Sequence, residues 1–139
     1  MDRFIFTAIG LVVGFGIASL GQVEKKGQTS KILLEHPVQG HLTDLNGKYE
    51  LRLSETVYDS GGYIGAHHHA GPGIRMVEEG NLRYVQPDKT TIYKPGDCFF
   101  ESGDVTHTAF NDGPGKVRLL NFELLPADWK GGSAISAPK

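Results

Sequence analysis

Short runs of apolar or alternating residues fill the middle of the chain, and clusters of Gly, Pro, Asn and Asp separate them. Runs of this length, bounded by such turn formers, are typical of β-strands. The pattern predicts strands at residues 31–35, 49–58, 63–69, 73–77, 82–85, 90–93, 98–101, 107–111 and 117–125. No run in this region has the 3.6-residue period of a long amphipathic helix. Strands this closely spaced favour a barrel or sandwich, because closure removes exposed sheet edges.

The first residues follow a different pattern. Residues 4–20 form an uncharged apolar run that follows Arg3 and precedes a polar stretch at 22–30. The run has the length of a short membrane-spanning helix, and Arg3 and Lys25 can snorkel outward. It also resembles a secretory signal peptide that would be cut near residues 19–21. We expect either a transmembrane anchor that holds the domain in the periplasm, or a cleaved signal peptide that leaves it secreted or periplasmic.

These patterns divide the chain into four parts. Residues 1–21 are the hydrophobic anchor or signal, 22–30 a linker, 31–126 the barrel and 127–139 a C-terminal tail. The tail is rich in Gly, Ser and Ala, which have little apolar surface to bury. We therefore expect one compact domain with a flexible tail, whose beginning is attached by Trp129.

Composition narrows the class of protein further. The chain has 139 residues, which suits one core, and its 19 glycines and 7 prolines agree with many tight turns. With 14 Lys and Arg against 16 Asp and Glu, the net charge is −2 and the basic excess typical of nucleic-acid binding is missing. Cys98 is the single cysteine, which excludes an internal disulfide. We therefore expect no nucleic-acid partner, and a small-molecule ligand stays open.

Two histidines lie at alternate positions of one predicted strand. Because strand side chains alternate between faces, His67 and His69 share one face and His68 takes the other. A His-x-His pair can hold a metal ion, but such a pair also occurs on barrel surfaces and in cores. A third histidine, His107, opens a later predicted strand.

The segment around the first two histidines resembles the first motif of the cupin family, G-x5-H-x-H-x3/4-E-x6-G. Its glycines and histidines match Gly61, His67, His69 and Gly80 at the required spacing. The motif's glutamate position is taken by Gly73.

The segment around the third histidine resembles the second cupin motif, G-x5-P-x-G-x2-H-x3-N. Gly96, His107 and Asn111 match, while Ser102 replaces the proline and Asp104 the glycine. The resemblance covers roughly two-thirds of the chain. It implies an all-β fold, a double-stranded β-helix barrel of the jelly-roll type, with a metal site inside its mouth.

The resemblance also implies that His67, His69 and His107 bind one divalent transition metal ion. Imidazole suits Fe, Zn, Ni and Cu, whereas a carboxylate ligand would favour Mn and Fe. Because Gly73 replaces that carboxylate, the metal is left open among Fe, Zn, Mn, Ni and Cu. Cupins with three-histidine sites include Fe-dependent dioxygenases.

Two charged residues are further candidates. If position 73 faces inward, Arg75 shares its face, where it would bind a substrate carboxylate or pair with a barrel acid such as Glu79. Glu101 leads towards the His107 loop, and we expect it to be the catalytic acid–base. It could also orient a ligand histidine, act as a fourth ligand, or be an exposed acid at a strand end.

Three kinds of function stay open, and the sequence does not decide whether the protein is an enzyme. The first is a small-molecule metalloenzyme of the dioxygenase or isomerase type. The second is a non-catalytic accessory subunit of a membrane protein complex, held by the helix at residues 4–20. Gly10 and Gly14 in that run have the spacing of close helix contacts. The third is a barrel that senses or binds a small molecule. A homodimer is a further expected assembly.

Overall fold

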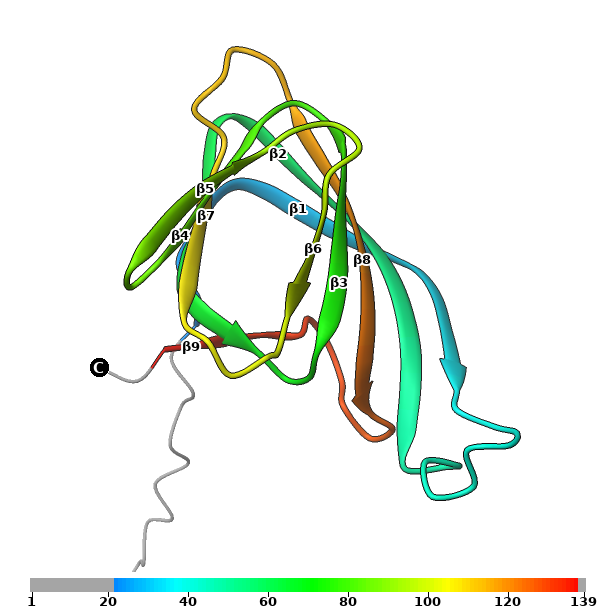
Figure 1. Cartoon of the computed structure of the whole chain (residues 1–139). Coiled ribbons are helices and arrows are strands. Elements are labelled where there is room, and N and C mark those ends of the chain that lie inside the picture. Colours follow the sequence, from blue (N-terminus) through cyan, green and yellow to red (C-terminus); the bar gives the residue numbers. More distant parts are fainter. Residues whose placement is uncertain (1–21, 138–139) are drawn as a thin grey trace, which may run out of the picture.

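The computed structural model describes residues 22–137, which form one curled β-sheet (Figure 1). Its strands are β1 (Lys25–Pro37), β2 (Tyr49–His69), β3 (Gly73–Glu79), β4 (Leu82–Gln86), β5 (Lys89–Tyr93), β6 (Cys98–Glu101), β7 (His107–Phe110), β8 (Val117–Pro126) and β9 (Ala134–Ser136). The predicted all-β class is confirmed. Between residues 22 and 137 there is no helix that could cross a membrane. The helix predicted at residues 4–20 lies outside the described residues and stays a prediction.

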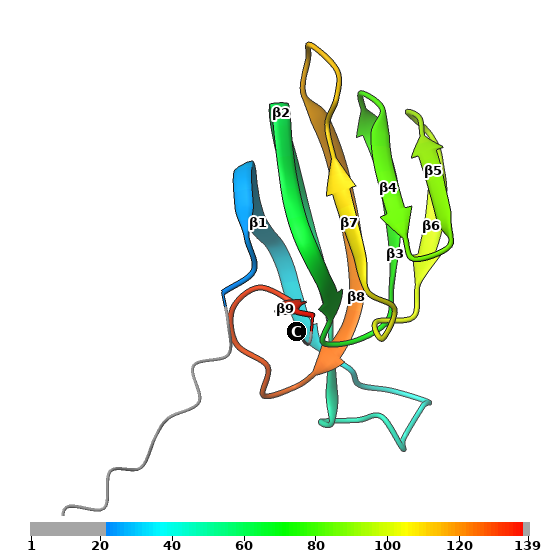
Figure 2. The same cartoon turned by 90° about the vertical axis from the view of Figure 1, so that its left-hand side faces the viewer.

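The sheet curls because the long strand β2 pairs with β8 along its first half and with β7 along its second half. The strand order is β5-β4-β7-β2-β8-β3-β6, and β1 and β9 also pair with β2. Residues 49–58 of β2 pair with β8, whereas residues 63–67 lie along β7 (Figure 2). The sequence predicts two strands here, because Gly61 and Gly62 suggest a turn. The structure has one bent strand instead, since Gly61, at a φ of 70°, bends the chain without reversing it.

The bend in β2 is held by Asn111, which directly follows β7 and is 2% exposed. Its side-chain amide donates hydrogen bonds of 2.7–3.2 Å to the carbonyl oxygens of Tyr58, Asp59 and Gly115. Its side-chain oxygen accepts a hydrogen bond from the backbone N–H of Gly113. One buried side chain therefore joins the bend of β2 to the turn between β7 and β8.

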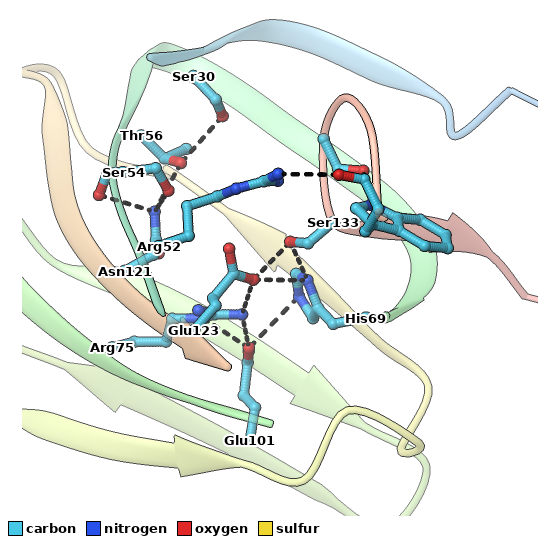
Figure 3. A network of polar contacts seen from close by, with 12 residues as sticks. Ser30, Arg52, Ser54, Thr56, His69, Arg75, Glu101, Asn121, Glu123 and Ser133 are labelled. Carbon is cyan, nitrogen blue, oxygen red and sulfur yellow. Dashed lines mark hydrogen bonds and ion pairs between the residues drawn. The ribbon is translucent and has the colours of Figure 1, made fainter. Parts of the chain in front are cut away.

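The inward-facing side chains change character along the barrel. One part of the interior is a buried apolar core of Tyr58, Ile64, Val77, Leu82, Tyr84, Ala109, Val117 and Leu119. Further along β2, β3 and β8 the inward positions are polar, and several of these side chains face one another in Figure 3. This second group comprises Glu50, Arg52, Ser54, Thr56, Arg75, Asn121 and Glu123. Buried polar groups are stable only when they have partners, so the polar end must hold a bonded network.

On the same strands, several outward positions beside this polar end are apolar. The register aligns Leu34, Leu53, Phe122, Ile74 and Phe100 in one row across β1, β2, β8, β3 and β6. Four of them are exposed, by 59% for Leu34, 45% for Phe122, 51% for Ile74 and 69% for Phe100. We call this set the outer apolar row. Alternation in the sequence thus marks these strands correctly but does not say that their polar side faces inward.

Both segments expected to flank the barrel contribute strands to it. β1 begins at Lys25, inside the range 22–30 expected to be a linker. β9 lies in the expected tail and pairs with residues 67–69 of β2. A strand can add through backbone hydrogen bonds alone, so a tail poor in apolar side chains still finds partners. Trp129 is half-buried, and its carbonyl oxygen lies 3.5 Å from Arg52 Nη2.

Replacing Asn111 should destabilise the whole barrel. In Asn111→Ala three carbonyl oxygens lose their donor, so we expect the free energy of unfolding to fall by about 2–4 kcal/mol. Urea denaturation of the variant and parent would measure the change. Asn81→Ala is the matched control, because Asn81 is exposed. An effect of Asn111→Ala as small as that of the control would contradict this role.

Candidate metal centre

An irregularity in β2 decides which histidines face the interior. Ile64 is buried, so strict alternation would turn Ala66 and His68 inward after it. The pairing with β7 shifts by one residue between Ile64 and His67, which is a β-bulge. The extra residue resets the alternation, and His67 and His69 face the interior.

The three histidines of the two motifs converge inside the barrel. One ring nitrogen from each lies within 4.8 Å of the others. Ring centroids are 4.2 Å apart for His67 and His107, 4.9 Å for His67 and His69, and 5.3 Å for His69 and His107. The predicted cluster of three histidines is therefore present, with ligand atoms close enough to share one ion.

The Nδ1 atoms of these rings are held by groups outside the cluster. His67 Nδ1 lies 2.7 Å from the carbonyl oxygen of Gly65, and His107 Nδ1 lies 3.0 Å from that of Val105. A carbonyl oxygen only accepts, so both Nδ1 atoms carry the proton and both Nε2 atoms keep a lone pair. Outer partners of this kind orient histidines that bind metals.

His69 is oriented by a chain of two further side chains (Figure 3). Its Nδ1 lies 3.0 Å from the hydroxyl oxygen of Ser133, and that hydroxyl donates to Glu123. Because the Ser133 proton goes to Glu123, the Ser133 oxygen accepts from His69 Nδ1. The Nε2 atom of His69 therefore also carries a free lone pair.

All three imidazoles are neutral at pH 7. Burial lowers the pKa of His67 from 6.5 to about 3, with a further contribution from His107. Burial, followed by the Arg75 charge, lowers the pKa of His69. Burial is likewise the main cause that lowers the pKa of His107, although Glu101 opposes it.

Glu101 faces the lone pairs of two of these histidines. Its Oε1 lies 3.2 Å from His107 Nε2, and its Oε2 lies 3.3 Å from His69 Nε2. Carboxylate oxygens and neutral Nε2 atoms are all acceptors, so these short contacts are unfavourable unless a cation lies between them. The donor set therefore fits a metal ion. Since Glu101 is 7% exposed, the alternative of an exposed strand-end acid is wrong.

Arg75 lies behind this carboxylate and links it to a second one. It is buried and faces inward, as the alternation from Gly73 predicts. Its Nε donates to Glu101 Oε2 at 2.6 Å, and its Nη2 donates to Glu123 Oε1 at 3.0 Å. The barrel acids that pair with Arg75 are thus Glu101 and Glu123, rather than Glu79. Among the described residues, Nη1 of Arg75 has no hydrogen-bond partner.

A cavity of about 240 Å³ adjoins the histidines. The polar network and the apolar core both contribute to its wall, and residues 131–134 of the C-terminal segment cover part of it. Arg52 fixes this segment by donating to the carbonyl oxygen of Gly131 at 2.6 Å. The volume is below the roughly 300–1,000 Å³ of pockets for drug-sized ligands, so it suits only a small molecule.

Sequence reasoning did not single out Glu123, Ser133 or Tyr84. Tyr84 stacks on His107 with centroids 4.6 Å apart, and burial followed by the Glu101 charge raises the pKa of its hydroxyl. The inward alternation of β8 is a signal that could have found Glu123. Ser133 had no such signal, because its position depends on the pairing of β9 with β2.

The metal-free protein should lose stability in mild acid. The pKa of His67 in the folded protein is about 3, far below its ordinary value of 6.5. Between these two pH values, His67 is protonated in the unfolded chain but not in the folded chain. Its stabilising contribution is complete above pH 6.5 and is lost progressively as the pH falls towards 3. Between pH 7 and pH 5, His67 alone should lower the free energy of unfolding by about 2 kcal/mol.

Denaturant unfolding of the chelator-treated protein at the two pH values measures this loss. His67→Gln should show a shallower pH dependence, because it removes one of the titrating groups. Equal unfolding free energies at pH 7 and pH 5 would contradict the neutral, buried state of the histidines.

Comparisons with known proteins agree with this architecture. A model of the cupin domain matches residues 54–123, just over half of the chain. The polyketide cyclase RemF from Streptomyces resistomycificus is a similar solved structure, with 19% identity and a TM-score of 0.60 over 85% of this chain and 80% of its own. A cupin-like protein from Thermotoga maritima has 23% identity and a TM-score of 0.54, over 83% of this chain and 85% of its own.

KdgF from Halomonas sp. has 19% identity and a TM-score of 0.54, over 72% of this chain and 84% of its own. At these identities the structural matches show the fold alone. No curated protein matches the chain. The domain match, the barrel and the two histidine segments together show that this protein belongs to the cupin family.

Proposed function

We propose that this protein is a metal-dependent cupin in which His67, His69 and His107 hold one divalent transition metal ion. One observation carries the proposal: three neutral imidazoles are oriented through Nδ1, have ring nitrogens within 4.8 Å of one another, and leave two Nε2 atoms facing a carboxylate. The candidate ions are Fe, Zn, Mn, Ni and Cu, which imidazole and carboxylate ligands accept.

The proposed activity is that of a small-molecule metalloenzyme of the dioxygenase or isomerase type. The bound ion would supply a Lewis acid that polarises a substrate oxygen. The histidines come from β2 and β7, and the adjoining cavity gives a compact substrate access to them. That a solved protein with the same fold is a polyketide cyclase supports an enzymatic use of such a barrel.

The charges around the site favour an anionic or oxygen-bearing substrate. Glu101 and Glu123 bring two negative charges and Arg75 brings one positive charge, so a divalent ion would leave the group with one excess positive charge. A substrate with a single negative charge would neutralise it. Arg75, which lines the cavity, is the proposed substrate anchor. Glu101 is the candidate for acid–base catalysis, and its position also suits coordination.

Removing one histidine should weaken metal binding. We expect the full-length parent protein to carry about one metal ion per chain, and His67→Ala and His107→Ala to bind it at least tenfold more weakly. Elemental analysis and metal titration measure both quantities. His41→Ala is the matched control, because His41 is exposed and lies outside the cluster. The site assignment fails if either cluster variant keeps the metal content and affinity of the parent.

A second candidate function is an accessory role in an assembly. The observation that favours it is the outer apolar row, since exposed apolar patches of this kind are typical of interaction surfaces. A membrane protein complex or a homodimer would cover it. In this role residues 4–20 would anchor the chain and place the barrel in the periplasm; cleavage after a signal peptide would leave it free there.

Membrane extraction distinguishes these two forms. If residues 4–20 anchor the chain, the full-length protein should stay with the membrane during carbonate extraction, because an inserted helix is not released by high pH. Recovery of a released protein whose N-terminus lies near residue 22 would contradict the anchor and support the cleaved signal.

A further inference from the structure

We propose that Glu101 is the fourth protein ligand of the metal centre, and that it supplies from β6 the carboxylate for which Gly73 on β3 has no side chain. This inference rests on the proposed three-histidine centre. It changes the role assigned to Glu101 from a free acid–base group to a ligand. It also predicts that the centre prefers Mn and Fe, which a carboxylate ligand favours.

The strand register places the two positions side by side. Gly73 and Glu101 are direct partners in the antiparallel pairing of β3 with β6. Both residues are buried, so both positions face the interior. Directly opposed residues have Cα atoms only about 4.5–5.5 Å apart. A carboxylate from position 101 can therefore reach the region that a side chain from position 73 would reach.

Position 73 itself has no room for a side chain. A Cβ on Gly73 would lie 2.7 Å from the carbonyl oxygen of Phe122 and 2.8 Å from Nη1 of Arg75. Contacts this short do not occur for real Cβ atoms, and the first partner is backbone that cannot move aside. The guanidinium of Arg75 occupies the space, so a carboxylate ligand has to come from another strand.

Arg75 leaves one carboxylate oxygen of Glu101 available. Nε and Nη2 of Arg75 both lie 2.6 Å from Oε2 of Glu101. No contact with Arg75 engages Oε1, which lies 3.2 Å from His107 Nε2. Two ligands bound to one ion at about 2.0–2.2 Å lie about 2.8–3.6 Å apart at the usual bond angles. The observed separation falls in this range.

Glu123 provides an internal contrast. It is buried and paired with Arg75, as Glu101 is, and it also lies beside His69. However, its Oε1 is 3.6 Å from Nδ1 of His69, on the side of the ring away from the lone pair, and it accepts from Ser133. Glu123 is therefore a positioning residue, and Glu101 is the carboxylate on the metal side.

The experiment compares Glu101→Gln with Glu123→Gln in the full-length protein loaded with Co(II) or Mn(II). If Glu101 is a ligand, Glu101→Gln should weaken Mn(II) binding about tenfold or more and shift the visible absorption bands of bound Co(II). Glu123→Gln should change the Co(II) spectrum less than Glu101→Gln, because it removes no metal ligand and its amide oxygen can still accept from Ser133. Both variants remove one charged partner of Arg75, so a general effect on that ion pair would appear in both.

The outcomes separate this inference from the proposed function. If the parent binds no metal, the proposed function fails and the ligand assignment fails with it. If the parent binds metal and Glu101→Gln keeps its spectrum and affinity, only the assignment of Glu101 is overturned.

Infrared difference spectra of the parent give a test that does not depend on folding of the variants. Binding of the metal should shift a carboxylate stretching band, because coordination changes the two C–O bonds. The absence of a shift in a protein that has bound the metal would overturn the assignment.

Discussion

The guanidinium of Arg75, buried between two carboxylates, fixes the arrangement of the polar end of the barrel. Arg75 on β3 binds Glu101 on β6 and Glu123 on β8, so one side chain connects three neighbouring strands. Breaking a buried ion pair costs several kcal/mol because it leaves a buried charge without a partner. Arg75, Glu101 and Glu123 are therefore held in their positions. The position of Glu101 on the Nε2 side of His69, and that of Glu123 on the Nδ1 side, follow from the same two ion pairs.

A second arginine plays a similar part at the edge of the cavity. Arg52 Nε lies 2.6 Å from Glu35 on β1, and its Nη2 lies 3.0 Å from Glu50. Because Arg52 also binds the carbonyl oxygen of Gly131, the C-terminal segment is connected to the barrel interior as well as to the edge of β2. The same segment carries Ser133, which holds His69. The covering of the cavity and the orientation of one histidine therefore depend on one stretch of chain.

Much of the architecture can be predicted from the local sequence. The predicted strand at 98–101 agrees with β6, and that at 82–85 with β4 to within one residue, because turn formers bound both. Gly80, a motif glycine, has a φ of 74°, and a Cβ there would lie 2.3 Å from the carbonyl oxygen of Lys116. Turn chemistry acts over a few residues, so a single sequence reveals it. The bend of β2 and the strand β9 were missed, since both depend on partners distant in sequence.

The sequence by itself determined the all-β class, most strand positions and the three histidines of the centre, because alternation and motif spacing are local properties of the chain. Only the tertiary structure decided what surrounds those histidines. The bulge after Ile64, the register that sets Glu101 beside Gly73, and the pairing that brings Ser133 to His69 each join residues from different strands. Register is set by the packing and hydrogen bonding of the whole sheet, so no local pattern specifies these contacts.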